Sequence, residues 1–313
     1  MPQSRLPAAR SLVTASLLLC LAACMSTQRS PDPVAAGTVV PARGNATGNW
    51  LADIGEMSAS VDNAARRAVV QRRLDALGIA WRAAPFEADD QRGTNLLAEL
   101  DAAADAPVLL IGAHFDRVDT GRGATDNASG SATVLALAER FKRTPLRHHR
   151  LAIAFWDLEE RGLLGAKAYI AGQTVPPALY VNFDVFGWGD TLWMMAPDPA
   201  HALLASTREA AAEAQLGLSA GPQYPPTDHL PFLAAKWPAV SYSLVGGDEI
   251  PLILQLYAGK KPKAVPKVMR VIHSDHDTPA QLDAVAALRG VDAVEDALRR
   301  WDAGAATMPP ISN

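Results

Sequence analysis

Three carboxylates stand within four consecutive positions of the sequence, at Asp157, Glu159 and Glu160. They follow Leu151 to Trp156, an unbroken apolar run of the kind that forms a fully buried strand. The active sites of open α/β sheets lie at the carboxyl ends of their strands. Adjacent glutamates point in divergent directions, so one can bind a metal ion while the other accepts a proton. An isolated Glu-Glu pair is more typical of a solvated acidic turn, and the interpretation therefore depends on the rest of the chain.

Further ionisable side chains follow the other predicted strands. Taken singly, each has a structural explanation: Asp126 can cap a helix, Asp184 can form a turn, and His114 can be a core histidine with satisfied hydrogen bonds. The same explanation repeated at successive strand ends is much less credible. The pattern predicts that one rim of one sheet gathers the side chains of His114, Asp116, Asp126, Glu159, Glu160, Asp184, His273, His276 and Asp277.

Strands and helices alternate along the predicted chain, which indicates an α/β fold with a mostly parallel sheet covered on both faces. Apolar runs predict the strands, and apolar residues near helical spacing predict the helices. Residues 250–266 mix a possible helix with Gly259 and three lysines, and we interpret them as an excursion or lid over the site. The predicted strands are Ile79–Phe86, Thr94–Leu100, Pro107–His114, Arg150–Trp156, Ala178–Val185 and Ala239–Leu244, and Thr191–Met195 is a short apolar piece. The predicted helices are Trp50–Gly78, Asp126–Arg143, Leu163–Ala171, Pro199–Leu216 and Asp283–Trp301.

The N-terminus has the pattern of a targeting segment. Arg5 and Arg10 precede a short apolar run that is too short for a comfortable transmembrane helix. The run ends in Leu21-Ala22-Ala23-Cys24, which resembles the lipobox of bacterial lipoproteins, although an ordinary secretory signal with an incidental cysteine is the alternative. Residues 1–23 are therefore predicted to be a lipoprotein signal, 24–48 a flexible tether lipidated at Cys24, and 49–313 the folded domain. This predicts a lipid-anchored protein of the bacterial cell envelope, at the outer membrane facing the periplasm.

Composition narrows the chemistry further. Cys20 would leave with the signal, so that the mature chain has no pair of cysteines for a disulfide or a cysteine metal site. Any metal ion must then be held by His, Asp and Glu. Loss of Arg5 and Arg10 takes the formal net charge from −4 to −6, which argues against a nucleic-acid partner.

Five short motifs, in this order, resemble those of the M28 family of zinc-dependent exopeptidases, chiefly aminopeptidases. They are His114-Phe115-Asp116, Asp126-Asn127-Ala128-Ser129-Gly130, Glu159-Glu160-Arg161-Gly162-Leu163-Leu164-Gly165, Asn182-Phe183-Asp184 and His273-Ser274-Asp275-His276-Asp277-Thr278. Each motif is moderately specific, whereas the ordered set is very specific. The resemblance covers about Thr94 to Leu282. It implies the zinc exopeptidase (phosphorylase/hydrolase-like) fold, a three-layer αβα sandwich around a mostly parallel mixed sheet.

The resemblance also implies two zinc ions and their ligands. One zinc would take Asp126, Glu160 and His273, and the other would take His114, Asp126 and Asp184. Each ion would then keep an open position, as catalytic zinc requires. The implied activity is removal of N-terminal residues from peptides.

Other residues receive roles from the same resemblance. Glu159 would be the general base on a zinc-bridging water. Asp116 and Asp277 would accept the second N–H of a ligand histidine and so orient its ring. His276 is an alternative to the histidine ligand of its motif. His229 is a possible oxyanion or substrate contact, and a satisfied loop histidine is about as good an interpretation.

Two other functions remain open at the level of sequence. Glutaminyl cyclases share this fold and most of these motifs but use one zinc, and Asp228 to Leu233 resembles that branch. Against it, Ile272 stands where the cyclases usually carry Trp, and the segments Asp126 to Gly130 and Glu159 to Gly165 are peptidase-like. An inactive, lipid-anchored binding protein is the other alternative, although no ligand position is visibly lost.

Overall fold

The structure is a computed structural model that describes residues 47–100 and 105–304. The predicted signal, the greater part of the tether and Cys24 lie outside these residues. Within them, no helix combines the length and the apolar character needed to cross a bilayer.

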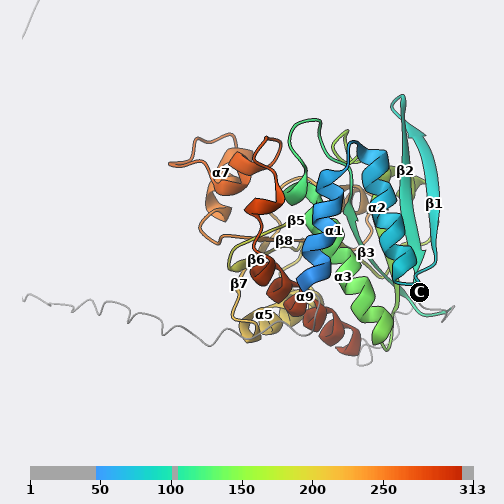
Figure 1. The fold of residues 1–313 in the computed structure, drawn as a ribbon. Coiled ribbons are helices and arrows are strands. Elements are labelled where there is room, and N and C mark those ends of the chain that lie inside the picture. The colour runs from blue at the N-terminus through green and yellow to red at the C-terminus, as the bar shows by residue number, and fades with distance from the viewer. Residues whose placement is uncertain (1–46, 101–104, 305–313) are drawn as a thin grey trace, which may run out of the picture. The chain divides into compact units, whose positions relative to one another are not determined.

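Eight strands form one mixed, mostly parallel sheet in the order β1-β2-β4-β3-β5-β8-β6-β7 (Figure 1). The central strands β4, β3, β5 and β8 are parallel to one another, whereas β1, β2 and β6 pair antiparallel with their inner neighbours. This confirms the predicted α/β fold with its mostly parallel mixed sheet. The strands are β1 (Trp81–Ala88), β2 (Gln91–Glu99), β3 (Val108–His114), β4 (Arg150–Trp156), β5 (Leu179–Phe186), β6 (Thr191–Met195), β7 (Gly217–Gly221) and β8 (Ala239–Val245).

Helices cover both faces of the sheet. The first face carries α1, α3, α5 and α9, which lie side by side in Figure 1, and the second face carries α4 and α6. A projecting lobe at the upper left of Figure 1 contains α7 and α8. The helices are α1 (Thr47–Ala59), α2 (Asn63–Ala76), α3 (Ser129–Arg143), α4 (Leu164–Ala171), α5 (Ala202–Glu213), α6 (His229–Ala234), α7 (Ile250–Tyr257), α8 (Lys267–Val271) and α9 (Ala284–Gly304), with short turns η1 (Ala124–Ala128) and η2 (Pro279–Gln281).

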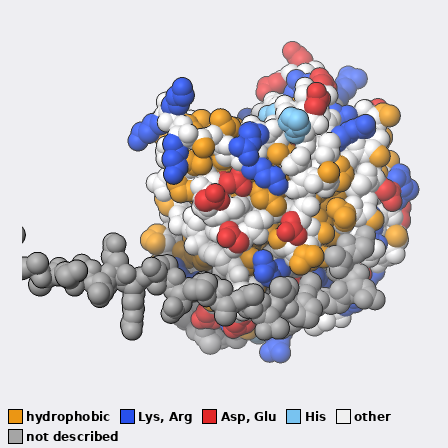
Figure 2. All heavy atoms as spheres, turned by 60° about the vertical axis from the view of Figure 1, so that its left-hand side comes forward, with side chains coloured by type: hydrophobic (Ala, Val, Ile, Leu, Met, Phe, Trp, Pro, Cys, Tyr) orange, Lys and Arg blue, Asp and Glu red, His pale blue; other side chains and the backbone are white. Residues whose placement is uncertain are grey.

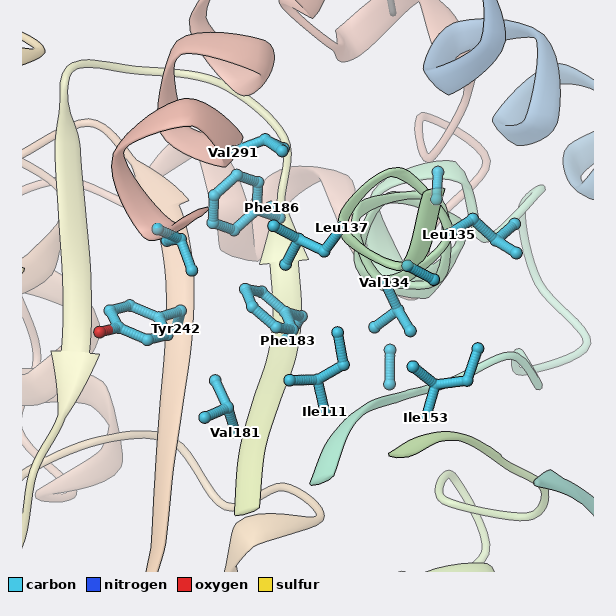
Figure 3. Packing of buried hydrophobic residues seen from close by; sticks show 14 of the residues in the cluster. Ile111, Val134, Leu135, Leu137, Ile153, Val181, Phe183, Phe186, Tyr242 and Val291 are labelled. Atoms are coloured by element: carbon cyan, nitrogen blue, oxygen red, sulfur yellow. The ribbon is translucent and has the colours of Figure 1, made fainter. Parts of the chain in front are cut away.

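The continuous apolar runs of the central strands supply both layers of the core. Alternate side chains of a strand point to opposite faces, so Ile111 of β3 packs on the α3 side while Leu110 packs on the α4 and α6 side. Figure 3 shows Ile111 and Phe183 of two neighbouring strands beneath Val134 of α3. The sheet is thereby fixed between two apolar layers, which holds its strand ends in register.

One helix prediction is wrong in its extent. The predicted helix Trp50–Gly78 is two helices, α1 and α2, with a break at residues 60–62. Asp62 has extended backbone angles and its carboxylate accepts the N–H of Ala65 at 2.7 Å, so that it begins a new helix as an N-cap. Val61, which lies in this break, is 83% exposed.

The short elements β7, α6 and α8 were not predicted, and the residues of the proposed lid include a helix. β7 pairs in parallel with β6 at the edge of the sheet, and its small residues carry little strand signal. The six-residue α6 begins at His229. The predicted excursion at 250–266 forms α7 and the connection to α8, which stand over one end of the sheet.

Candidate metal centre

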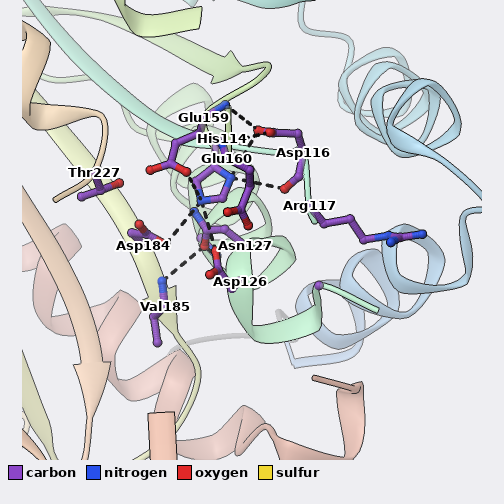
Figure 4. Close-up of polar contacts among 12 residues, drawn as sticks. His114, Asp116, Arg117, Asp126, Asn127, Glu159, Glu160, Asp184, Val185 and Thr227 are labelled. Atoms are coloured by element: carbon purple, nitrogen blue, oxygen red, sulfur yellow. Dashed lines mark hydrogen bonds and ion pairs between the residues drawn. The ribbon is translucent and has the colours of Figure 1, made fainter. Parts of the chain in front are cut away.

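Asp126 lies between His114 and His273 at the carboxyl end of the sheet, and Figure 4 shows it beside His114. Its Oδ1 is 3.2 Å from His114 Nε2, and its Oδ2 is 3.1 Å from His273 Nε2. The two oxygens of one carboxylate therefore face two separate imidazoles. This is the arrangement expected of a carboxylate that bridges two cations.

The donor atoms around Asp126 fall into two groups. One contains His114, Glu159 and Asp184, and the other contains Asp126, Glu160 and His273. Within each group the ligand atoms all lie within 4.8 Å of one another. Imidazole and carboxylate donors in this number suit zinc.

Two oxygens of these groups are buried without a hydrogen-bond partner in residues 47–100 and 105–304. They are Oε1 of Glu160 and Oδ1 of Asp184. Buried carboxylate oxygens are normally hydrogen-bonded, because desolvation without a partner is costly. Together with the clustered carboxylates, these atoms fit a site completed by cations.

The donors come from five segments of the chain that meet at this rim. His114 is the last residue of β3, Asp126 lies in η1, Glu159 and Glu160 follow β4, and Asp184 is in β5. The parallel strands β3, β4 and β5 are neighbours in the sheet, so that their carboxyl ends bring these side chains together. His273, which follows α8, comes from the far end of the chain.

Asp116 holds the Glu159-Glu160 pair by its backbone. Its Oδ1 accepts the N–H of Glu159 at 3.0 Å, and its Oδ2 accepts the N–H of Glu160 at 3.2 Å. Oδ1 is also 3.4 Å from His114 Nδ1. The carboxylate is 1% exposed and thus links the β3 end to the turn after β4.

Asp277 is buried beside the site, but it does not contact a histidine ring. Its Oδ1 accepts the N–H of Thr125 at 2.6 Å, and its Oδ2 accepts the N–H of Asp126 at 3.2 Å. These two hydrogen bonds hold the backbone at Asp126, a contact that the sequence did not predict, and the predicted bond to a ligand histidine stays a prediction. His276, the alternative ligand, is exposed and lies outside both donor groups.

Several residues around the site adopt left-handed backbone angles although they have side chains. Leu158, Leu163, Val185 and His273 have φ between 55° and 62°. Such conformations cost free energy outside glycine and concentrate at functional sites. These four residues flank or belong to the donor set, which indicates that the surrounding structure fixes the donors.

The motif glycines allow close approaches of backbone next to the donors. A Cβ on Gly165 would lie 2.4 Å from Oδ1 of Asn95 and 2.5 Å from the carbonyl oxygen of Asp157. A Cβ on Gly130 would lie 2.4 Å from the carbonyl oxygen of Phe183. Helices α3 and α4 can therefore begin directly against the strand ends that carry the donors.

The clustered charges shift the pKa values of the histidines. Burial alone would lower the pKa of His114, but the carboxylates of Glu159, Asp116, Asp126 and Asp184 raise it well above its usual value. Hydrogen bonds to Asp126 and Glu160 raise the pKa of His273 to about 10. Without a metal ion, the site therefore holds protons on its imidazoles.

The pKa values of the two glutamates move upward. Burial raises the pKa of Glu159 well above its usual value, and the nearby carboxylates of Asp228, Asp184 and Asp126 raise it further. Burial also raises the pKa of Glu160. A carboxyl group with a raised pKa can both accept and return a proton near neutral pH.

A cavity of about 360 Å³ opens beside the donors. Its charged lining consists of the carboxylates and His273, and among the described residues no Lys or Arg lines it. Figure 2 shows the surface hollowed beside the lobe, with histidine side chains exposed nearby. The rest of the lining is mainly apolar and includes Leu163, Val185, Trp193, Tyr224, Pro225, Pro226, Val245, Ile253, Tyr257, Val268, Met269 and Ile272.

His229 and its neighbour Asp228 are buried behind this cavity. His229 is 2% exposed, its ring meets Tyr224 edge-on with centroids 5.7 Å apart, and it does not line the cavity. Burial lowers the pKa of His229 to about 4. Burial raises the pKa of Asp228 well above its usual value, and neither of its carboxylate oxygens has a hydrogen-bond partner among the described residues.

Sequence reasoning did not identify the apolar wall of the site. Trp193 and Tyr224 meet with ring centroids 4.7 Å apart, and Ile253 and Met269 approach from the lobe. These residues come from separate parts of the chain, and none belongs to a motif. The i, i+4 spacing of Ile253 and Tyr257 in an apolar helix was the available signal.

Comparisons with known proteins agree with this geometry. The model of "Peptidase family M28" matches residues 95–297. Leupeptin-inactivating enzyme 1 of Streptomyces exfoliatus is 30% identical over 258 residues, which are 77% of this chain and 55% of that protein. The chain thus spans about half the length of this relative.

Solved structures with the same fold include an aminopeptidase and a cyclase. The LapA aminopeptidase of Legionella pneumophila has a TM-score of 0.65 at 17% identity, with 81% of this chain and 71% of LapA covered. The glutaminyl cyclase of Porphyromonas gingivalis has a TM-score of 0.62 at 17% identity, with 82% and 96% covered. At these identities the likeness shows the fold alone.

Proposed function

The chain belongs to peptidase family M28, and from this membership and the chemistry of its site we propose that it is a zinc-dependent aminopeptidase. The substrate would be a peptide with a free amino terminus and an apolar first residue. The single observation that carries this proposal is the cavity, which has an acidic end at the donor groups and an apolar body.

The donor set supports two zinc ions. His114, Asp126 and Asp184 would hold one, and Asp126, Glu160 and His273 would hold the other. Support for this assignment comes from the buried Oδ1 of Asp184, whose contact is an ion pair with His114 at 3.5 Å, and from the buried Oε1 of Glu160, which has no hydrogen-bond partner among the described residues. When bound, two such ions polarise a peptide carbonyl and make a water molecule more acidic.

Glu159 would move the proton in this reaction. It accepts a proton from the attacking water and returns it to the leaving amine nitrogen. Its backbone is fixed by the hydrogen bond to Asp116, and burial raises its pKa above the usual range in the metal-free chain. His114, Asp126 and Asp184 already supply three donors, which leaves Glu159 free for this role.

The cavity explains why the amino end of a peptide is the better fit. A free amino group is cationic, and the charged residues of the lining other than His273 are carboxylates. A carboxypeptidase would instead need a cation to bind the terminal carboxylate. The apolar wall, which includes Trp193 and Met269, suits a substrate side chain such as that of Leu, Met or Phe.

The test is a substrate series with a matched variant. We expect hydrolysis of leucine, methionine and phenylalanine anilides, weak hydrolysis of the aspartate anilide, and none of N-acetyl-leucine anilide. Glu159→Gln should keep the zinc content of the wild type and lose at least 100-fold in kcat. Hydrolysis of the acetylated substrate, or an unchanged rate in Glu159→Gln, would refute the proposal.

A glutaminyl cyclase is the second candidate. The observation that favours it is the fold match, which covers 96% of the Porphyromonas gingivalis cyclase. Release of ammonia from a Gln-peptide with one zinc per chain would identify that activity. We rank it second because both donor groups are complete.

We also propose that the chain is anchored in the bacterial cell envelope by lipid on Cys24. The support is the sequence Leu21 to Cys24 alone. Incorporation of labelled palmitate in cells should occur in the wild type and be absent from Cys24→Ser. Equal labelling of both would contradict this proposal.

A further inference from the structure

Residues 115–123 form the connection between β3 and η1, two elements that carry metal donors. Asp116 lies near the start of this connection, and Asp126 follows shortly after its end. Asp116 in turn holds the backbone of Glu159 and Glu160. The position of most of the donor set therefore depends on how this connection is held.

One guanidinium contacts both ends of the connection. Arg66 of α2 donates from Nε to the carbonyl of Phe115 at 2.6 Å. It also donates from Nη1 to the carbonyl of Arg122 and from Nη2 to that of Gly123, both at 3.0 Å. A fourth bond reaches the carbonyl of Met57 in α1 at 3.2 Å.

Asn63, one turn before Arg66 on α2, forms two hydrogen bonds with the same connection at Arg117. Its Nδ2 donates to the carbonyl of Arg117 at 3.3 Å, and its Oδ1 accepts the N–H of Arg117 at 3.1 Å. The side-chain amide thus pairs with the backbone of Arg117 as a neighbouring strand would. Positions i and i+3 lie on one face of a helix, so the first turn of α2 presents both side chains together.

Burial of the Arg66 guanidinium costs free energy. It is 0% exposed, and all four of its described hydrogen bonds go to neutral carbonyl groups. A buried charge without a directly bonded counter-ion costs free energy. Burial, followed by the charge of Arg117, lowers its pKa to about 10, while Asp116, Asp277 and Asp126 oppose this shift. Arg66 therefore stays charged at neutral pH and faces the acidic side of the site.

We propose that Asn63 and Arg66 are positioning residues, which hold the 115–123 connection so that Asp116 and Asp126 set the metal donors before any metal binds. The clamp acts through the backbone, because neither side chain touches a donor atom. It rests on the proposed function in that it requires the donor set to bind zinc.

The test measures zinc affinity on the metal-stripped full chain, by competition with a chromophoric chelator. Arg66→Lys keeps the charge and loses the planar fork, so that a change in affinity reports geometry. Asn63→Ala is the milder variant, for use if Arg66→Lys does not fold. Asp75→Ala, which removes the hydrogen bond from Trp81 Nε1 at the opposite end of α2, is the matched control for Asn63→Ala. Arg140→Lys alters a second buried arginine, which is paired with Asp292 and Glu295 away from the site.

We expect Arg66→Lys and Asn63→Ala to weaken zinc binding by about tenfold or more, a size typical of residues that orient metal ligands. The two controls should keep the affinity of the wild type even where they lower Tm. Amide hydrogen exchange of residues 117–123 should be faster in metal-free Asn63→Ala than in metal-free Asp75→Ala.

Two results separate the possible failures. Unchanged zinc affinity in Arg66→Lys and Asn63→Ala, with a wild type that binds zinc, would overturn the clamp and leave the proposed function standing. A wild type that binds no zinc would overturn both.

Discussion

Asp116→Asn should separate metal binding from folding. The change preserves the shape of the side chain but replaces one carboxylate oxygen by an NH₂ group. The two oxygens now accept the N–H groups of Glu159 at 3.0 Å and Glu160 at 3.2 Å. In the variant, one of these N–H groups must face another donor, so that Glu159 or Glu160 loses its position.

The magnitude follows from the lost bond. A hydrogen bond to a charged group contributes about 1.5–3 kcal/mol, and a residue that orients metal ligands typically changes metal affinity by about 10–100-fold. At about 1.4 kcal/mol per factor of ten, the two ranges agree. In the metal-free protein the loss of folding stability should be smaller than this range, because the variant also removes one negative charge from the acidic cluster.

Asp157→Asn is the matched control. Asp157 is also a buried carboxylate that accepts two backbone N–H groups, from Thr94 at 2.8 Å and Leu158 at 3.0 Å. It does not contact Glu159 or Glu160 through its side chain. We expect a similar loss of Tm in both variants, with weaker zinc binding and lower kcat/KM confined mainly to Asp116→Asn.

The assay is zinc titration of the stripped proteins, followed by kcat/KM on leucine anilide at saturating zinc. Wild-type zinc affinity in Asp116→Asn would refute the role assigned to Asp116. An equal loss of affinity in Asp157→Asn would show that any buried carboxylate near the site has the same effect.

Three further predictions concern the metal, the cavity and pH. Treatment with EDTA should lower Tm, and Zn²⁺ should restore it better than Mg²⁺, because His114 and His273 offer nitrogen donors; equal rescue by Mg²⁺ would contradict this. Ile253→Asp should reduce kcat/KM for leucine anilide at least tenfold with zinc content unchanged. An unaltered substrate profile would show that the side chain of the substrate's first residue does not bind against Ile253. Burial raises the pKa of Asp53 to about 6 despite the ion pair with Arg73, so its protonation stabilises the fold below pH 4 and this contribution is lost as the pH rises through 6. The free energy of unfolding of Asp53→Asn minus that of the wild type should therefore be larger at pH 8 than at pH 4, by up to about 3 kcal/mol. Urea titration in EDTA measures both proteins. The same difference at both pH values would argue against the raised pKa of Asp53.

The central strands were predictable because their own residues determine them. The apolar runs that became β3, β4 and β5 need no distant partner to be recognised, and the polar residues at their ends mark where the strands leave the core. Five motifs, of which three lie at such strand ends, were enough to bring His114, Asp126, Glu160, Asp184 and His273 into one predicted site.

Other features depend on contacts that the sequence does not display. The break before α2 depends on one cap at Asp62, which competes with a continuous helical pattern. Asp277 was assigned to a histidine, but its hydrogen bonds go to backbone N–H groups of η1. The cavity wall forms only when the lobe meets Trp193 and Tyr224, so that neither its position nor its volume follows from local patterns.

The number of zinc ions per active chain tests the central claim most directly. The stripped protein would be titrated with zinc while bound metal and release of leucine are measured on the same samples. Our account predicts that binding saturates at two zinc ions per chain and that full activity is reached there. Saturation at one zinc with ammonia released from a Gln-peptide, or no leucine release at saturating zinc, would contradict it.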